Sequence, residues 1–179
     1  MTPDRPILVA LGANLPSRFG GPMDTLRAAL AALSERGVAV AACSAFYRTP
    51  PWPPGSDQPD YVNAVARVTT ALGPVELLAC LHSVEADFGR VRSVANAARP
   101  LDLDLVAHGA VVMDGNVVVP HPRLADRAFV LLPLRDVAPD WVDPRTGRAL
   151  PDLLAALPRA DVESCERLSD APAGLVKAP

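Results

Sequence analysis

The spacing of apolar residues changes several times between residues 7 and 106. Four short runs, in which apolar residues are continuous or alternate with polar ones, predict β-strands at residues 7–11, 38–47, 61–70 and 101–106. Two stretches between them repeat apolar residues with the period of a helix and end at a glycine, Met23–Gly37 and Pro74–Gly89. The order strand, helix, strand, strand, helix, strand is the split βαβ arrangement of a ferredoxin-like fold.

The rest of the chain adds smaller elements to this pattern. Residues 111–119, with Asp114-Gly115 at their centre, predict a hairpin, and residues 129–137 and 150–157 predict short helices. We therefore expect an α+β fold, a ferredoxin-like βαββαβ sandwich with an added hairpin and C-terminal helices. Its two helices would cover one face of the sheet and leave the other face for a ligand. We expect one domain over residues 1–160 and a loosely held tail over residues 161–179, which lack periodicity.

Composition and charge narrow the possible partners. The 179 residues carry a net charge of −3, which argues against a nucleic-acid binder, and no apolar run reaches the roughly 18–20 residues that span a bilayer. The apolar stretch near the N-terminus is too short for a secretion signal, and the three cysteines lack metal-ligand spacing. We expect a cytoplasmic monomer with reduced thiols that binds neither nucleic acid nor membrane.

The strongest chemical signal is the segment Leu101-Asp102-Leu103-Asp104-Leu105. Side chains alternate along a strand, so both aspartates would lie on one face, roughly 7 Å apart. Paired carboxylates repel each other and are costly to desolvate unless a cation joins them, and such hard oxygen ligands suit Mg²⁺. The alternative is a solvated strand face that carries two acids.

Basic residues on both sides of this pair favour a polyphosphate ligand, because guanidinium groups near Mg²⁺ hold and stabilise phosphates. The sequence contains no GxxxxGK[ST] motif, so a P-loop is excluded. Taken singly, each cation is equally compatible with a surface or packing role. The candidates are Arg90, Arg92, Arg99, His121 and Arg127.

Tyr61 and Asn63 share a strand face directly after a loop with five prolines between residues 49 and 59. An aromatic ring that stacks and an amide that pairs with ring edges could together recognise a flat heterocycle. The alternative is an ordinary strand tyrosine and a turn asparagine.

Between Val9 and about Pro139 the sequence resembles the 6-hydroxymethyl-7,8-dihydropterin pyrophosphokinases of folate biosynthesis. Each motif is weak alone, but their order is that of the family. The matching segments are residues 11–15 (LGANL), 47–51 (YRTPP), 58–64 (QPDYVNA), 85 with 89–92 (E and GRVR), 101–104 (LDLD), 119–122 (VPHP) and 127–131 (RAFVL).

The resemblance implies pyrophosphoryl transfer from ATP to the pterin alcohol, with release of AMP. It implies two Mg²⁺ ions on Asp102 and Asp104, which with Arg90 and Arg99 form the catalytic set. ATP would be bound by Glu85, Arg90, Arg92, Arg99, His121 and Arg127. The pterin would be bound by Thr49, Pro51, Trp52, Tyr61, Asn63 and Phe129.

The main departure from the family pattern lies just before the aspartates. The family often has Arg-Trp-Gly-Pro-Arg on a mobile loop that closes over ATP, whereas this chain has Ala95-Asn96-Ala97-Ala98-Arg99. Residues 89–98 bury few large apolar side chains, so we expect them to be mobile without nucleotide. The altered loop also leaves open a rival function, a non-catalytic ferredoxin-like module that binds pterin or nucleotide.

Overall fold

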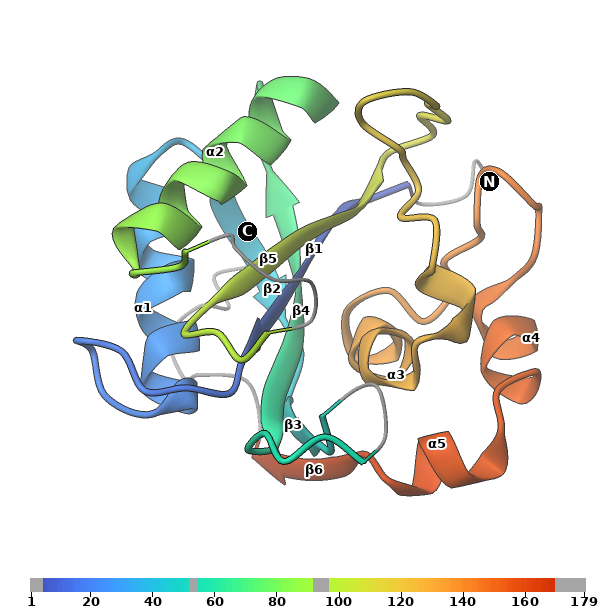
Figure 1. Ribbon diagram of the computed structural model, residues 1–179. Coiled ribbons are helices and arrows are strands. Elements are labelled where there is room, and N and C mark those ends of the chain that lie inside the picture. Colours follow the sequence, from blue (N-terminus) through green and yellow to red (C-terminus); the bar gives the residue numbers. More distant parts are fainter. Residues whose placement is uncertain (1–4, 52–54, 92–96, 170–179) are drawn as a thin grey trace.

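The computed structural model describes residues 5–51, 55–91 and 97–169 (Figure 1). Within these ranges, six strands form one antiparallel sheet in the order β5-β1-β4-β3-β6, and β2 pairs separately with β4. The strands are β1 (Ile7–Ala13), β2 (Ala39–Cys43), β3 (Phe46–Thr49), β4 (Tyr61–Thr69), β5 (Asp102–His108) and β6 (Glu166–Ser169). The helices are α1 (Pro22–Glu35), α2 (Pro74–Asp87), α3 (Ala128–Val137), α4 (Leu150–Ala155), α5 (Arg159–Glu163) and the short 3₁₀ helix η1 (Leu124–Asp126).

The two long helices begin and end where the sequence predicts. Each starts at a proline in its first turn, where the missing N–H costs nothing. Each is followed by a glycine with positive φ, Gly37 at 77° and Gly89 at 87°, a conformation that residues with a Cβ rarely adopt. No helix in the described ranges is both long and apolar enough to cross a membrane.

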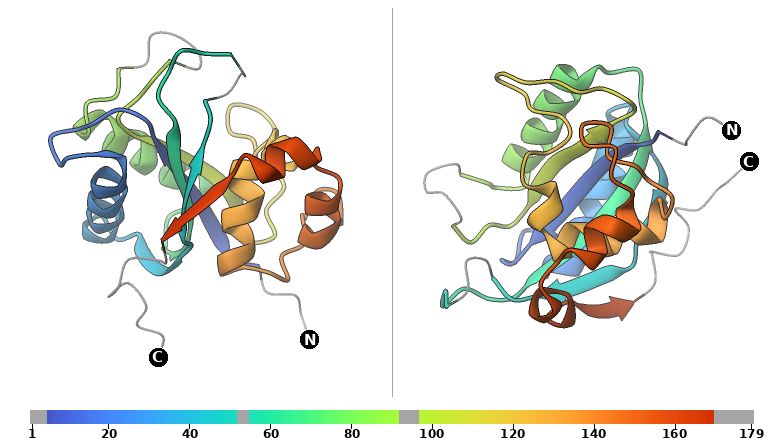
Figure 2. Two further views of the ribbon diagram at one scale, coloured as in Figure 1. Left: turned by 90° about the horizontal axis from the view of Figure 1, so that it is seen from below. Right: turned by 90° about the vertical axis from the view of Figure 1, so that its right-hand side faces the viewer.

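Helices cover both faces of the sheet, and the prediction that one face stays open is wrong in this respect (Figure 2). On one face, Val9 and Leu11 of β1 pack with the apolar stripes of α1 and α2. On the other, Leu8 packs with Leu131 of α3 and with Trp141. Because α3 presents a continuous apolar side, it covers that face of the sheet and leaves only one end of it to a ligand.

The predicted strand at residues 38–47 is two strands. Cys43 pairs with Ala66 and Tyr47 with Asn63, so β2 and β3 contain one residue more between these pairs than β4 does. This is the geometry of a β-bulge. The Ser44 hydroxyl fills the gap, because it accepts a hydrogen bond from the Val65 N–H (2.9 Å) and donates one to the Ala45 carbonyl (2.7 Å).

The C-terminal part also differs from the expected loosely held tail. Residues 159–163 form α5 and residues 166–169 form β6, which pairs with β3. Leu168 packs against the main core and so anchors the strand. With only four residues, the strand is too short to show a periodic pattern in the sequence. Residues 170–179 lie outside the described ranges. The predicted hairpin at residues 111–119 is reduced to one bridge between Met113 and Val119.

The Asp136 carboxylate, on the exposed side of α3, anchors the end of this helix to the bulge. Asp136 accepts hydrogen bonds from the Tyr47 hydroxyl (3.1 Å) and from the Ala45 N–H (3.1 Å). Burial, with the negative charge of Asp136 next, raises the pKa of Tyr47 and keeps its hydroxyl protonated.

We expect Tyr47→Phe to lower the free energy of unfolding by about 1 kcal/mol, because one hydrogen bond to a charged group is lost. Asp136→Ala should cost more, about 2–3 kcal/mol, because it leaves two buried donors without their acceptor. Urea unfolding of both variants measures the difference. A Tyr47→Phe protein as stable as the parent would contradict the role of this contact.

Candidate active site

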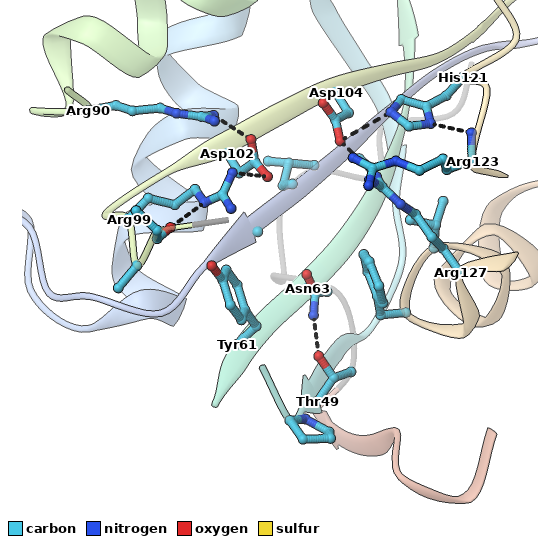
Figure 3. A pocket seen from close by; sticks show the side chains of 18 of the residues that line it. Thr49, Tyr61, Asn63, Arg90, Arg99, Asp102, Asp104, His121, Arg123 and Arg127 are labelled. Atoms are coloured by element: carbon cyan, nitrogen blue, oxygen red, sulfur yellow. Dashed lines mark hydrogen bonds and ion pairs between the residues drawn. The ribbon is translucent and has the colours of Figure 1, made fainter. Parts of the chain in front are cut away.

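One end of the sheet carries an open pocket of about 460 Å³ between α3 and the three neighbouring strands β5, β1 and β4 (Figure 3). Alternate residues of each strand face it: Ala10 and Gly12 from β1, Tyr61 and Asn63 from β4, Asp102 and Asp104 from β5. Leu103 and Leu105, between and after the aspartates, are buried in the core on the opposite face. The alternation inferred from the sequence thus places both carboxylates on the pocket side.

Asp102 is held between two arginines on one side of the pocket (Figure 3). Arg90 and Arg99 each donate a hydrogen bond to a different carboxylate oxygen of Asp102, Arg99 over 3.1 Å. Burial alone would lower the pKa of Arg99, but Asp102 and Tyr61 outweigh it and raise that pKa. The guanidinium of Arg99 also lies 6.0 Å from the centre of the Tyr61 ring.

Arg90 is itself held by an ion pair with Glu85, which is 1% exposed. The Glu85 carboxylate accepts hydrogen bonds from Arg90 and from the Leu103 N–H (2.7 Å), in the middle of β5. Glu85 does not line the pocket. It joins α2, the strand of the two aspartates and one of their cations into a single network, which supports Arg90 from behind.

Asp104 has a separate group of cations on the other side of the pocket (Figure 3). Arg127 donates to its carboxylate over 3.2 Å, and the Nε2 atom of His121 lies 3.8 Å from the same oxygen. Burial lowers the pKa of both His121 and Arg127, although Asp104 acts in the opposite direction. The Arg123 N–H lies 3.2 Å from His121 Nδ1, so a neutral His121 would carry its proton on Nε2, toward Asp104.

The opposite part of the pocket is less charged. Asn63 is 6% exposed, and its amide donates to the Thr49 hydroxyl over 2.7 Å. Tyr61 and Phe129 also line the pocket. Gly12 leaves room for the amide, because an added Cβ would lie 2.9 Å from the Asn63 Oδ1 atom and one of the two would have to shift. The lining therefore offers an amide and two aromatic rings beside the charged part.

Most candidates from the sequence meet in this pocket, and some do not. Those that line it are Thr49, Tyr61, Asn63, Arg90, Arg99, Asp102, Asp104, His121, Arg127 and Phe129. Pro51 does not line it, and its neighbour Pro50 does. Trp52, Arg92 and the middle of the expected mobile loop, residues 92–96, lie outside the described residues.

Sequence reasoning missed Arg123, which lines the pocket and whose charge contributes to lowering the pKa of His121 and Arg127. Its position two residues after His121 was the available signal. Among the described lining residues, four arginines face two aspartates, which leaves a local formal charge of +2 in a chain of net charge −3. A field of this sign attracts anionic ligands.

The fold and the site together define a mixed α/β domain whose pocket combines a positively charged part with an amide and two aromatic rings. Comparison with known proteins makes this specific. The profile of the family 7,8-dihydro-6-hydroxymethylpterin-pyrophosphokinase (HPPK) matches residues 8–139. The chain belongs to this family.

Individual relatives agree with the profile. The 2-amino-4-hydroxy-6-hydroxymethyldihydropteridine pyrophosphokinase of Pseudomonas aeruginosa is 42% identical over 167 residues, 92% of this chain and 98% of the relative. The enzyme of the same name from Synechocystis is 40% identical over 149 residues, 82% of this chain and 73% of the relative. A crystal structure of HPPK-DHPS in complex with substrates shares the fold, with a TM-score of 0.67 at 11% identity, over 87% of this chain and 43% of that one.

Proposed function

We propose that this chain transfers the pyrophosphoryl group of ATP to the hydroxymethyl oxygen of 6-hydroxymethyl-7,8-dihydropterin and releases AMP, as a step of folate biosynthesis. The observation that carries the proposal is the division of one pocket into two parts. Paired aspartates among arginines occupy one part, and an amide with aromatic side chains occupies the other. Such a pocket can hold a polyphosphate and a heterocycle side by side.

The two aspartates fit Mg²⁺ by their chemistry. They are hard oxygen donors on one strand face, and no group of three or more metal-ligating side chains occurs among the described residues. Mg²⁺ is commonly held in this way, by one or two carboxylates with water and substrate phosphates completing the shell. We assign two Mg²⁺ ions to Asp102 and Asp104. When bound, they supply positive charge to the attacking and leaving oxygens.

The arginines would carry most of the remaining work. In the reaction, the hydroxymethyl oxygen forms a bond to the β-phosphorus of ATP. The bond from that phosphorus to the bridging oxygen of AMP breaks, AMP keeps the electron pair, and the hydroxyl proton is released. Arg90 and Arg99, which both pair with Asp102, would neutralise the charge that builds up on the phosphate oxygens. His121 and Arg127 would bind the same triphosphate from the side of Asp104.

The heterocycle would lie against the opposite part of the pocket. Asn63 would pair with the edge of the pterin ring, with its orientation set by Thr49. Tyr61 and Phe129 would stack on the ring, and the segment of Thr49, Pro51 and Trp52 would complete this side.

Topology supports a finer description of the fold. From one edge, β5, β1, β4 and then β2 with β3 lie in the order fourth, first, third and second of the four strands that the sequence predicts. We class the sheet as ferredoxin-like on this order, with α3, α4, α5 and β6 as additions. We propose that the enzyme works as a cytoplasmic monomer on pterin and ATP.

The rival is a binding module without turnover. The paired acids and their arginines argue against it, because a module that only binds its ligands has little need for two carboxylates in a site for polyanions. An assay of AMP release with ATP, Mg²⁺ and the pterin alcohol separates the two functions. AMP that accumulates in proportion to pterin consumed supports the enzyme, and binding of both ligands without AMP supports the module.

Arg123→Gln is expected to raise the KM for ATP about three- to tenfold and to leave kcat within about twofold. Arg123 is exposed at the rim of the pocket, so salt partly screens the attraction between its charge and the polyphosphate. Initial rates at two salt concentrations measure the effect, which should shrink at high salt. Arg135→Gln on α3, outside the pocket, is the matched control, and an unchanged KM in the Arg123 variant would remove Arg123 from the site.

A further inference from the structure

Asn14 is a buried polar residue, 2% exposed, that follows directly after β1 and does not line the pocket. Its side-chain oxygen accepts a hydrogen bond from the Arg99 N–H (2.9 Å). Its side-chain amide donates to the Pro59 carbonyl (3.1 Å) and to the Gln58 side-chain oxygen (3.2 Å). One side chain thus joins two loops that are 40 residues apart in the sequence.

The first of these loops ends in the charged part of the pocket. The Arg99 carbonyl accepts hydrogen bonds from the N–H groups of Asn14 (3.2 Å) and Leu15 (3.3 Å). Both polar groups of the Arg99 backbone are therefore fixed to the end of β1. This fixes the origin of the side chain whose guanidinium reaches Asp102 over 3.1 Å.

The second loop leads into the other part of the pocket. Pro59 lies two residues before Tyr61, the first residue of β4, and Asn63 follows on the same strand face. Because the Pro59 carbonyl is held by Asn14, the backbone just before Tyr61 is restrained, and with it the position of the Tyr61 side chain in the pocket. The guanidinium of Arg99 lies 6.0 Å from the Tyr61 ring centre, so the two restrained side chains also meet each other.

We infer that Asn14 is a positioning residue that couples the two ligand sites, so that binding at either one favours binding at the other. The inference rests on the proposed function, because it takes ATP and the pterin as the two ligands. A ligand that restrains Arg99 also restrains the Pro59 carbonyl through Asn14, and the reverse. The second ligand then loses less conformational entropy when it binds, because its side of the pocket is already restrained, and this produces positive coupling.

Two variants divide the link chemically. Asn14→Leu has a similar volume and removes both side-chain contacts. Asn14→Asp keeps an acceptor for the Arg99 N–H and, when ionised, loses the donor to Pro59 and Gln58. Gln58→Leu removes one of the two acceptors of the Asn14 amide on the pterin side and lies outside the core, so it tests the link even if a change at Asn14 prevents folding. Thr25→Val is the control, because it removes buried hydrogen bonds to Ser17 and Gly21 away from the pocket.

The experiment is calorimetric titration of the full chain with Mg²⁺ and a non-transferable ATP analogue, and with 6-hydroxymethylpterin. Each ligand is titrated alone and with the other at saturation, and the ratio of the two Kd values is the coupling factor. We expect the parent to show a factor well above one. Asn14→Leu should reduce it about tenfold, Asn14→Asp and Gln58→Leu less, and Thr25→Val not at all. Each Kd measured alone should change less than the coupling factor.

Several results would overturn the inference. They are a coupling factor near one in the parent, an unchanged factor in Asn14→Leu and Gln58→Leu, or an equal loss in Thr25→Val. If Asn14→Leu does not fold, an unchanged factor in both Asn14→Asp and Gln58→Leu overturns it. AMP release by the parent separates this outcome from failure of the proposed function. A parent that turns over without coupled binding contradicts only the role of Asn14.

Discussion

Asp104→Asn and Asp102→Asn are each expected to lower AMP release at saturating Mg²⁺ by at least about a hundredfold. The substitution keeps the shape of the side chain and removes one negative charge from the pair that would hold the metal. An acid pair that served only as a solvated strand face would tolerate the change. Steady-state rates with ATP and the pterin alcohol measure it.

The structure also sets the expected effect on stability. Two like charges alone would make removal of one neutral or stabilising. Each aspartate, however, already has its own basic partners: Arg90 and Arg99 for Asp102, and Arg127 with the nearby His121 ring for Asp104. We therefore expect each variant to lose on the order of 1 kcal/mol in metal-free thermal melts. Activity and stability should thus both fall, but activity by far the more.

Asp24→Asn is the matched control for both variants. Asp24 pairs with Arg27 over 3.1 Å on α1, outside the pocket, so it also loses a salt bridge. Its AMP release should equal that of the parent. Near-parental activity of either Asp102→Asn or Asp104→Asn at saturating Mg²⁺ would refute the metal assignment and the mechanism built on it.

Asn63→Ala should weaken binding of the pterin about 5- to 150-fold, the equivalent of about 1–3 kcal/mol, and binding of the ATP analogue far less. Asn63 is 6% exposed, and its partner Thr49 would be left without the amide donor that now lies 2.7 Å away. Calorimetry with each ligand separately measures the two losses. Equal losses for both ligands would argue that Asn63 supports the pocket as a whole.

Two further changes test whether the position of the Asn63 amide matters. Thr49→Val keeps Asn63 but removes the hydroxyl that orients it, and should produce a smaller loss in the same direction. Gly12→Ala should also weaken the pterin, because the new Cβ would lie 2.9 Å from Asn63 Oδ1 and displace the amide. If neither change altered pterin affinity, the orientation of Asn63 would be irrelevant to recognition.

Much of the fold followed from local pattern. The two helices with proline at one end and glycine at the other, and the strand faces of Tyr61 and Asn63 and of Asp102 and Asp104, are properties of a few neighbouring residues. The break between β2 and β3 was missed because it depends on where the Ser44 hydroxyl meets β4, a long-range contact. The strand at residues 166–169 was missed because its pairing with β3, rather than its sequence, defines it.

The site was predictable as a set of residues and only partly as an arrangement. Each arginine near the aspartates could be identified, but the sequence did not indicate that Arg90 and Arg99 would share Asp102 while Arg127 pairs with Asp104. The residues next to Asn14 in the sequence do not predict its role. Its contacts with Arg99 and Pro59 depend on loops that only the folded sheet brings together.

The pairing of the aspartates with arginines has a consequence for how binding responds to salt. The pocket carries its own counter-ions. Before ligands bind, Asp102 and Asp104 neutralise arginine side chains. In a phosphate site without such carboxylates, anions from the buffer would neutralise these arginines instead. A metal that takes the carboxylates frees these arginines for phosphate, so partners are exchanged within the protein and fewer buffer ions are expelled. Nucleotide affinity should therefore fall less steeply with ionic strength than four arginines would suggest.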